Sequence, residues 1–145
     1  MESSPWKRVP NQAAPGNDWA MPATSGDPDH TVNFDYLTNG ENEVILFTAV
    51  AEINPTNTIY NISFDQSGGN YYAPNQLYKT VTKDENWDSS LNTNEHTSEE
   101  FKDKEGRVIL KRTYANSMID PVTLSFETHD TYYVYDQYGN LTYVI

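Results

Sequence analysis

Apolar and polar residues alternate along much of the chain, with the period of a β-strand. Val32, Phe34 and Tyr36 are each separated by a polar residue, which places them on one face of a strand. The run 43–50 is apolar and rich in β-branched residues, which favours a strand, and a helix over 41–53 is the alternative. Further strands are predicted at 58–64, 76–83, 99–104, 107–114, 122–128, 131–136 and 140–145.

Turn residues separate these runs at intervals of about ten to twelve residues. Asn39-Gly40 lies between the first two runs, and Asn-Gly is the strongest short signal of a β-hairpin. The sequence therefore predicts that 31–36 pairs with 43–50. Because strand follows turn without a helical period, we expect an all-β fold of antiparallel hairpins, arranged as an open strip or a small sandwich.

Composition divides the chain into four segments. Residues 1–30 are rich in Pro, Gly, Asn and Ala, and their prolines exclude a long helix, so an irregular segment with one short strand near Lys7–Val9 is expected. A β-hairpin region follows over 31–83. The longest polar stretch, 84–98, is predicted to be a loop or linker, and 99–145 carries two similar hairpins.

The two hairpins of 99–145 share the turn sequence Asp-x-x-Gly, with Asp103 and Gly106 in one copy and Asp136 and Gly139 in the other. Asp suits the first position of a type I turn because its carboxylate accepts a nearby backbone N–H, and Gly suits the fourth, where φ is often positive. A polar and then an apolar residue follow the glycine in both copies, as Arg107-Val108 and Asn140-Leu141. A spaced repeat indicates an architecture, so we interpret the two aspartates as turn formers rather than catalytic groups.

This pattern resembles a known repeat. Tyr-x-Tyr-Asp-x-x-Gly-Asn-Leu over 133–141 is similar to the tyrosine–aspartate (YD) repeat of the Rhs family, the tc-toxin shells and the teneurins. The earlier Asp-Lys-Glu-Gly-Arg-Val fits the Gly-Arg-Leu form of that repeat, and its surroundings are similar to Rhs-like surface proteins of Bacteroidetes. Only 101–114 and 132–145 match specifically. Segments 3–9 and 71–77 resemble decayed copies, the latter with Asn75 in the glycine position.

The resemblance implies a structural function. In Rhs-like and tc-toxin shells, YD hairpins pair edge to edge into a strip that encloses a C-terminal effector, often a toxin. This chain would then be a fragment of a longer bacterial protein, secreted or at the cell surface, and a non-catalytic part of its shell. Its partners would be the rest of its own polypeptide and the enclosed C-terminal domain, and open strand edges would allow self-association.

Charge and composition exclude several classes of function. The net charge of −12, from 21 acidic and 9 basic residues, argues against binding to nucleic acid or to anionic membranes. The absence of cysteine excludes disulfides and cysteine catalysis. No apolar run reaches the roughly 18 residues of a membrane-spanning helix, and the N-terminus has no apolar signal-peptide region.

Candidate chemistry is sparse. His30, His96 and His129 share no metal-ligand spacing, and the acidic clusters lack a calcium-loop pattern, so neither a metal nor another cofactor is expected. The short catalytic motifs of hydrolases and nucleotide-binding enzymes are absent. We therefore expect no enzymatic activity. A polysaccharide-acting hydrolase is the least favoured hypothesis, because a count of carboxylates does not show two at catalytic distance.

A binding function is the main alternative to a structural one. Eleven tyrosines and three tryptophans give the chain many rings with one polar end. Exposed rings of this kind would let an extracellular β-domain bind a glycan or a partner protein, and Tyr71 and Trp87 are the candidate residues. The sequence does not indicate a ligand, a cargo, a secretion route or an oligomeric state.

Overall fold

The chain folds into β-strands joined by turns. The computed structural model describes residues 8–16, 20–21, 30–65, 69–88, 94–115 and 127–145. Within these ranges there is no helix, and the sheets are antiparallel, so the predicted all-β fold is confirmed. The alternative of a helix over 41–53 is thereby excluded. Most of the predicted strand 122–128, and of the segment 3–9 that resembles a decayed repeat, lies outside the described residues.

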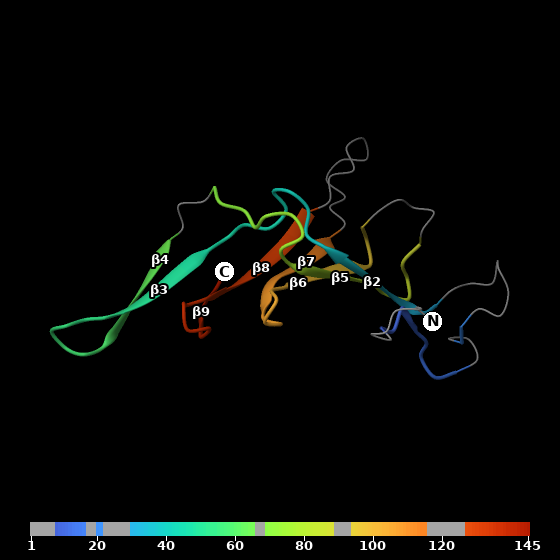
Figure 1. Cartoon of the computed structure of the whole chain (residues 1–145). Helices are drawn as coiled ribbons and strands as arrows, with labels where there is room; N and C mark the ends of the chain where they lie inside the picture. The colour runs from blue at the N-terminus through green and yellow to red at the C-terminus, as the bar shows by residue number, and fades with distance from the viewer. Residues whose placement is uncertain (1–7, 17–19, 22–29, 66–68, 89–93, 116–126) are drawn as a thin grey trace. The chain divides into compact units, whose positions relative to one another are not determined.

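Nine strands are described (Figure 1): β1 Asn11–Gln12, β2 Val32–Thr38, β3 Thr48–Ile53, β4 Tyr60–Asp65, β5 Tyr78–Lys83, β6 Thr97–Lys102, β7 Val108–Ala115, β8 Glu127–Tyr135 and β9 Leu141–Val144. Seven form one sheet in the order β1-β2-β5-β6-β7-β8-β9, and β3 and β4 form a separate two-stranded sheet. From β5 onward each strand is the neighbour of the next in sequence, as in a series of hairpins.

Packing divides the chain into two compact units. The first comprises Met1–Leu37, Thr80–Glu99 and Arg112–His129, and the second comprises Thr38–Lys79, Glu100–Lys111 and Asp130–Ile145. Each unit therefore combines three separated stretches of sequence. The strands β5 to β8 have residues in both units.

The predicted hairpin around Asn39-Gly40 is wrong, because the neighbours of β2 are β1 and β5. Gly40 does not have the positive φ that an Asn-Gly hairpin turn requires. Asn39 is instead buried, and its Oδ1 accepts hydrogen bonds from the N–H groups of Gln76 (2.9 Å) and Leu77 (2.7 Å). Its Nδ2 donates to the carbonyl of Ala73 (2.9 Å). The side chain thus anchors a distant segment and does not close a local turn.

Other strand boundaries also differ from expectation. The strand predicted over 43–50 begins at Thr48, because 44–46 bonds with 70–72 through an isolated bridge between Ile45 and Tyr71. The short N-terminal strand that the structure describes lies at Asn11–Gln12, just after the predicted Lys7–Val9, of which Lys7 is outside the described residues. The predicted loop 84–98 gives way to β6 at Thr97.

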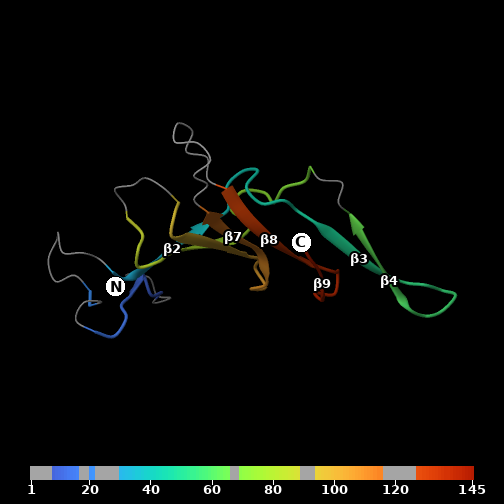
Figure 2. The ribbon, with the colours of Figure 1, turned by 180° about the vertical axis from the view of Figure 1, so that it is seen from behind.

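The strands β3 and β4 pair without a break in register, from Thr48 opposite Asp65 to Ile53 opposite Tyr60. The N–H of Asn54 donates to the carbonyl of Ile59 (2.8 Å) and closes the loop. Both views show this pair of strands with its loop pointing away from β8 and β9 (Figure 1, Figure 2). We call β3, β4 and their loop the arm.

The hydrophobic core of the second unit consists of six buried residues from five parts of its sequence: Val44, Leu77, Phe101, Ile109, Leu110 and Tyr132. Phe101 of β6 and Leu110 of β7 have no exposed surface. Removing such side chains from water is the main favourable term in folding, so this cluster holds β6, β7 and β8 together with the segment around Val44.

Leu110→Ala is expected to lower the free energy of unfolding by about 2–5 kcal/mol, because it removes buried methyl groups and leaves a cavity. Leu141→Ala is the matched control, since Leu141 is 52% exposed, and it should cost less than about 1 kcal/mol. Urea denaturation followed by circular dichroism measures both. Equal losses in the two variants would contradict the assignment of the core.

Candidate functional site

Asp103 organises the turn between β6 and β7. Its backbone N–H donates to the carbonyl of Arg107 (3.0 Å), and its carbonyl accepts from the N–H of Gly106 (3.1 Å). Its Oδ1 accepts from the N–H groups of Glu105 (3.0 Å) and Arg107 (2.8 Å), and its Oδ2 accepts from Arg107 Nε (2.7 Å). Gly106 has a φ of +83°. This is the three-residue hairpin loop in which a type I turn ends in a left-handed residue.

The turn between β8 and β9 repeats these contacts around Asp136. Its N–H donates to the carbonyl of Asn140 (2.9 Å), and its carbonyl accepts from the N–H of Gly139 (3.0 Å), whose φ is +85°. Its Oδ1 accepts from the N–H groups of Tyr138 (2.9 Å) and Asn140 (2.8 Å). Asn140 Nδ2 donates to Oδ2 (3.0 Å), so this side chain occupies the place that Arg107 has in the first turn.

Hydrogen bonds favour the ionised form in these turns. They lower the pKa of Asp136, chiefly through the side-chain amide of Asn140 and also through backbone N–H groups of the turn, while burial acts in the opposite direction. The hydrogen bond to Asp103 raises the pKa of Arg107. Both carboxylates are buried and bonded at each oxygen. In this arrangement each carboxylate holds the backbone of its own turn in place.

A third turn is built from two separate parts of the chain. Asn75 has a φ of +63°, as expected for its place in the glycine position. Its N–H donates to the carbonyl of Asn39 (2.9 Å), and the N–H of Asn39 donates to the carbonyl of Leu77 (3.2 Å). With the side-chain bonds of Asn39 described above, this residue performs the role that an aspartate performs within each of the other turns. No local sequence signal identifies it, because the residues that it binds lie far along the chain.

Tyr135, which precedes Asp136, links the second hairpin to the first. Its ring centroid lies 5.1 Å from the guanidinium carbon of Arg107, a cation–π contact. Its hydroxyl donates to the carbonyl of Val108 (3.0 Å). The tyrosine of one Asp-x-x-Gly hairpin therefore lies against the two residues that follow the glycine of the other.

Gln137 attaches the arm to the second turn. Its Oε1 accepts from the N–H of Ala51 (2.9 Å), and its Nε2 donates to the carbonyl of Ala51 (2.6 Å). We call this pair of bonds the Gln137 clamp. Aromatic contacts continue the attachment, with ring centroids 4.8 Å apart for Phe64 and Tyr143 and 6.5 Å apart for Tyr60 and Tyr138.

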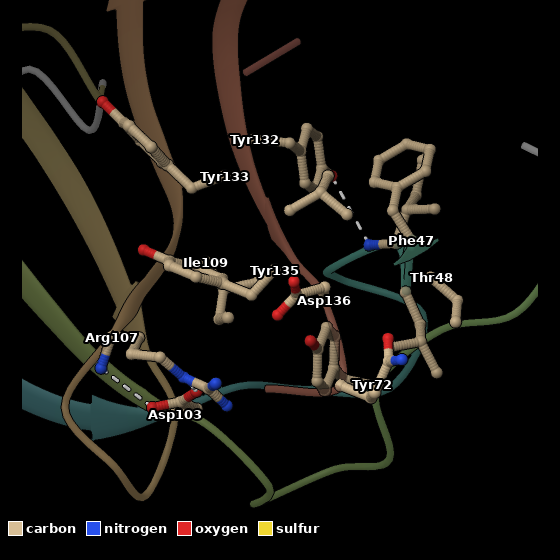
Figure 3. Close-up of a pocket in the computed structure, with 14 residues that line it drawn as sticks. Phe47, Thr48, Tyr72, Asp103, Arg107, Ile109, Tyr132, Tyr133, Tyr135 and Asp136 are labelled. Atoms are coloured by element: carbon tan, nitrogen blue, oxygen red, sulfur yellow. Dashed lines mark hydrogen bonds and ion pairs between the residues drawn. The ribbon is translucent and has the colours of Figure 1, made fainter. Parts of the chain in front are cut away.

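A cavity of about 230 Å³ lies beside the two turns. Its lining includes Tyr72, Tyr132 and Tyr135 together with both turn aspartates and Arg107 (Figure 3). Burial, and then the nearby Asp103 carboxylate, raise the pKa of Tyr72, so its hydroxyl stays protonated at neutral pH. The aspartates already hold backbone and side-chain groups of their own turns, and the Gln137 amide holds the arm.

The candidate ligand-binding aromatics fall in different units. Tyr71, in the second unit, is 43% exposed. Trp87, in the first unit, is half-buried, and Lys83 Nζ lies 4.2 Å from its ring centroid. Neither unit by itself brings the two rings into one surface.

The histidines and acidic side chains form no metal centre in the described part of the chain. His96 lies 3.1 Å from the Asp84 carboxylate through Nδ1 and has a φ of +60°. An open groove of about 410 Å³ runs beside this pair and is lined by Thr82, Asp84, Glu95, His96, Thr97, Ser98 and Tyr114. Among the described residues, no helix is long and apolar enough to cross a membrane.

Comparison with known proteins adds no relative. Neither the protein-family models nor the curated proteins and solved structures yield a match to this chain.

Gly106→Ala is expected to lower the free energy of unfolding by about 1–2 kcal/mol, because the positive φ strains any residue with a Cβ. The added Cβ would meet no atom within 4 Å, so the loss would come from the strained backbone and not from a steric clash. Gly139→Val should cost about 1–3 kcal/mol, since its Cβ would also lie 3.1 Å from Arg107 Nη1.

Gly40→Ala is the control for both glycine variants, because Gly40 has no positive φ and the nearest atom to the added Cβ would be a flexible Glu43 side-chain oxygen at 3.5 Å. Its midpoint of thermal unfolding should stay within experimental error of the wild type. If Gly106→Ala left the midpoint equally unchanged, the turn geometry would be incorrect.

Acid should remove the stabilisation that Asp136 provides. Because its pKa is lowered in the folded state, this contribution is present at neutral pH and is lost as the pH falls below about 4 through the folded-state pKa. The difference in stability between wild type and Asp136→Asn should therefore shrink between pH 6 and pH 2, roughly the range over which carboxylates titrate. Glu52→Gln, at an exposed position of β3, is the control and should show a small difference throughout. A constant gap for Asp136→Asn would argue against an ionised carboxylate in the turn.

Proposed function

We propose that this chain is a non-catalytic structural module, a piece of a β-strip of YD type that joins further hairpins of its own polypeptide. The observation that supports this proposal is the contact of Tyr135 with Arg107 and Val108. This contact joins two successive Asp-x-x-Gly hairpins through residues of the motif itself. The motif thus includes both the residues that form the turn and the residues that contact the neighbouring hairpin.

The second hairpin presents the same features to a further neighbour. Asn140 and Leu141 occupy the positions of Arg107 and Val108, and Leu141 is 52% exposed. Among the described strands β9 has only β8 as a neighbour. The next hairpin of a strip would set its tyrosine on this pair of residues, as Tyr135 lies on the earlier pair.

The free edge of β9 is suited to such pairing. Ile145 and Tyr132 exchange both backbone hydrogen bonds, at 2.9 and 3.0 Å, so the N–H and C=O of Val144 point away from β8. Residues 137–145 carry no charged side chain. Exposed edges usually carry charges or prolines that prevent pairing, and this edge has neither.

By resemblance, the strip would form the wall of a shell around a C-terminal effector, in a secreted or surface protein of a bacterium. The wall would act sterically, because closely packed hairpins separate the enclosed domain from its surroundings. A glycan-binding or partner-binding β-domain has weaker support, since Lys83 already covers one face of Trp87. The hydrolase hypothesis is weaker still, because both turn carboxylates are engaged in backbone hydrogen bonds.

The strip is tested by extending the chain. A second copy of residues 130–145 placed after Ile145 should pair with β9, slow hydrogen exchange of the Val144 amide and raise the midpoint of thermal unfolding. The matched control is the same extension in which the copies of Tyr135 and Gly139 are replaced by Ala and Val. It should leave both the exchange of the Val144 amide and the midpoint of thermal unfolding unchanged. An intact extension that leaves the Val144 amide unprotected would overturn the proposal.

The native gene provides a second test. Codons that follow Ile145 should encode further Asp-x-x-Gly hairpins and then an unrelated C-terminal domain. An adjoining sequence without such hairpins would remove the shell and leave the binding function as the leading hypothesis.

A further inference from the structure

The arm has one strand edge that nothing described in the structure occupies. β4 pairs only with β3. The Gln137 clamp binds the backbone of Ala51 from the side away from β4, and Ile62 is the residue opposite Ala51. In an antiparallel pair, residues opposite each other point their backbone groups the same way, inward or outward. Ile62 therefore directs its N–H and C=O away from β3, and so, by alternation, do Tyr60 and Phe64.

This edge lacks the features that normally prevent strand pairing. Residues 53–64 contain no charged side chain, in a chain of which 21% of residues are charged. The register between β3 and β4 has no bulge. Pro55 lies in the loop and not on the edge. Proteins usually block exposed edges with lysines, prolines or bulges, so an edge without them is a surface for β-strand addition.

We propose that β4 pairs antiparallel with β4 of a second copy of this chain, with Ile62 opposite Ile62 of the second copy. In this register Tyr60 faces Phe64 of the second copy, and Phe64 faces its Tyr60. Each of these residues has its N–H and C=O on the open edge, so all three positions exchange backbone hydrogen bonds across the two-fold axis. Asn61 and Ser63 face each other on the opposite side of the sheet.

Charge favours a second copy paired through β4 over one paired elsewhere. Two molecules that each carry −12 repel wherever their acidic side chains meet. Pairing through β4 brings together residues 60–64 of the two copies, none of which carries a charge. Aromatic and β-branched side chains placed directly opposite each other are favourable cross-strand pairs. The strand is thus complementary to itself in this register.

The arm is held in a conformation that can pair. The Gln137 clamp and the contact of Phe64 with Tyr143 attach it to the β8–β9 hairpin at both strands. Tyr60 and Ile62 nevertheless remain 53% and 46% exposed. An edge fixed before association loses little conformational freedom on binding. The interface is small, so the dimer should be weak and in reversible equilibrium with the monomer.

The dimer is tested by sedimentation velocity from about 10 μM to about 1 mM, the range of weak complexes, in low and high salt. The mass should rise with concentration, and more so in high salt, because salt screens the repulsion between acidic molecules. Hydrogen exchange adds a residue-level measurement. The amides of Asn61 and Ser63 should be protected at all concentrations, and those of Tyr60, Ile62 and Phe64 only where the dimer forms.

Variants at the two-fold axis make the test specific. Ile62→Lys and Ile62→Glu each place like charges opposite one another and should each weaken the dimer at least about tenfold. An equimolar mixture of the two should regain dimers, because Lys then faces Glu. Ile53→Lys is the matched control: Ile53 is 58% exposed against 46% for Ile62, but it lies on β3, so the added charge should leave the dimer intact.

Three results would overturn the proposal. The first is a monomer at every concentration, and the second is a dimer that Ile62→Lys leaves unchanged. The third is a dimer with no concentration-dependent protection of the Ile62 amide, which would place the contact elsewhere, including the β9 edge. Because these variants do not alter β9, failure of this dimer leaves the proposed hairpin strip untouched, and the reverse also holds. Far-ultraviolet circular dichroism of each variant establishes that the fold is retained.

Discussion

The structure of the second unit depends on a carboxylate that binds the backbone of its own turn. A hairpin loop leaves N–H groups that the strand ladder does not satisfy, and an unbonded buried N–H costs about 1–3 kcal/mol. Asp103 and Asp136 satisfy these groups within four residues of their own position, and glycine supplies the left-handed residue that lets the chain turn back. The turn geometry fixes the register of the flanking strands, and that register places the side chains of Phe101 and Leu110 in the core.

The same requirement explains the part of the unit that has no such aspartate. The segment 73–77 also turns through a left-handed residue, Asn75, and its N–H groups also need an acceptor. Asn39 provides it from the end of β2, at the cost of burying an amide completely. Both solutions give the turn a side-chain oxygen that accepts two backbone N–H groups, and the long-range one ties two distant parts of the chain together.

This contrast explains which features the sequence could predict. The all-β fold follows from alternation, and the turns at Gly106 and Gly139 follow from a motif whose donors and acceptors lie within four residues. Asn39-Gly40 carries an equally strong local signal, yet the expected hairpin does not form, because backbone donors at Gln76 and Leu77 compete for the same side chain. Similarly, the strand expected at 43–50 begins later, since 44–46 bonds with 70–72. The Gln137 clamp has no local signal either, because it joins a variable position of the turn motif to backbone of the arm.

The Gln137 clamp also affects how freely the sequence can change. It recognises the backbone of Ala51, which every residue except proline presents in the same form, so the clamp itself does not require alanine. Ala51 is nevertheless buried, and burial restricts this position to small apolar side chains. The clamp instead requires the side-chain amide of Gln137, which occupies one of the two positions of Asp-x-x-Gly that the turn itself does not specify. In the first turn Lys104 holds the equivalent position and is exposed. Two copies of one motif within a single chain thus place different structural demands on the same position, which is a surface residue in the first copy and the attachment point of the arm in the second.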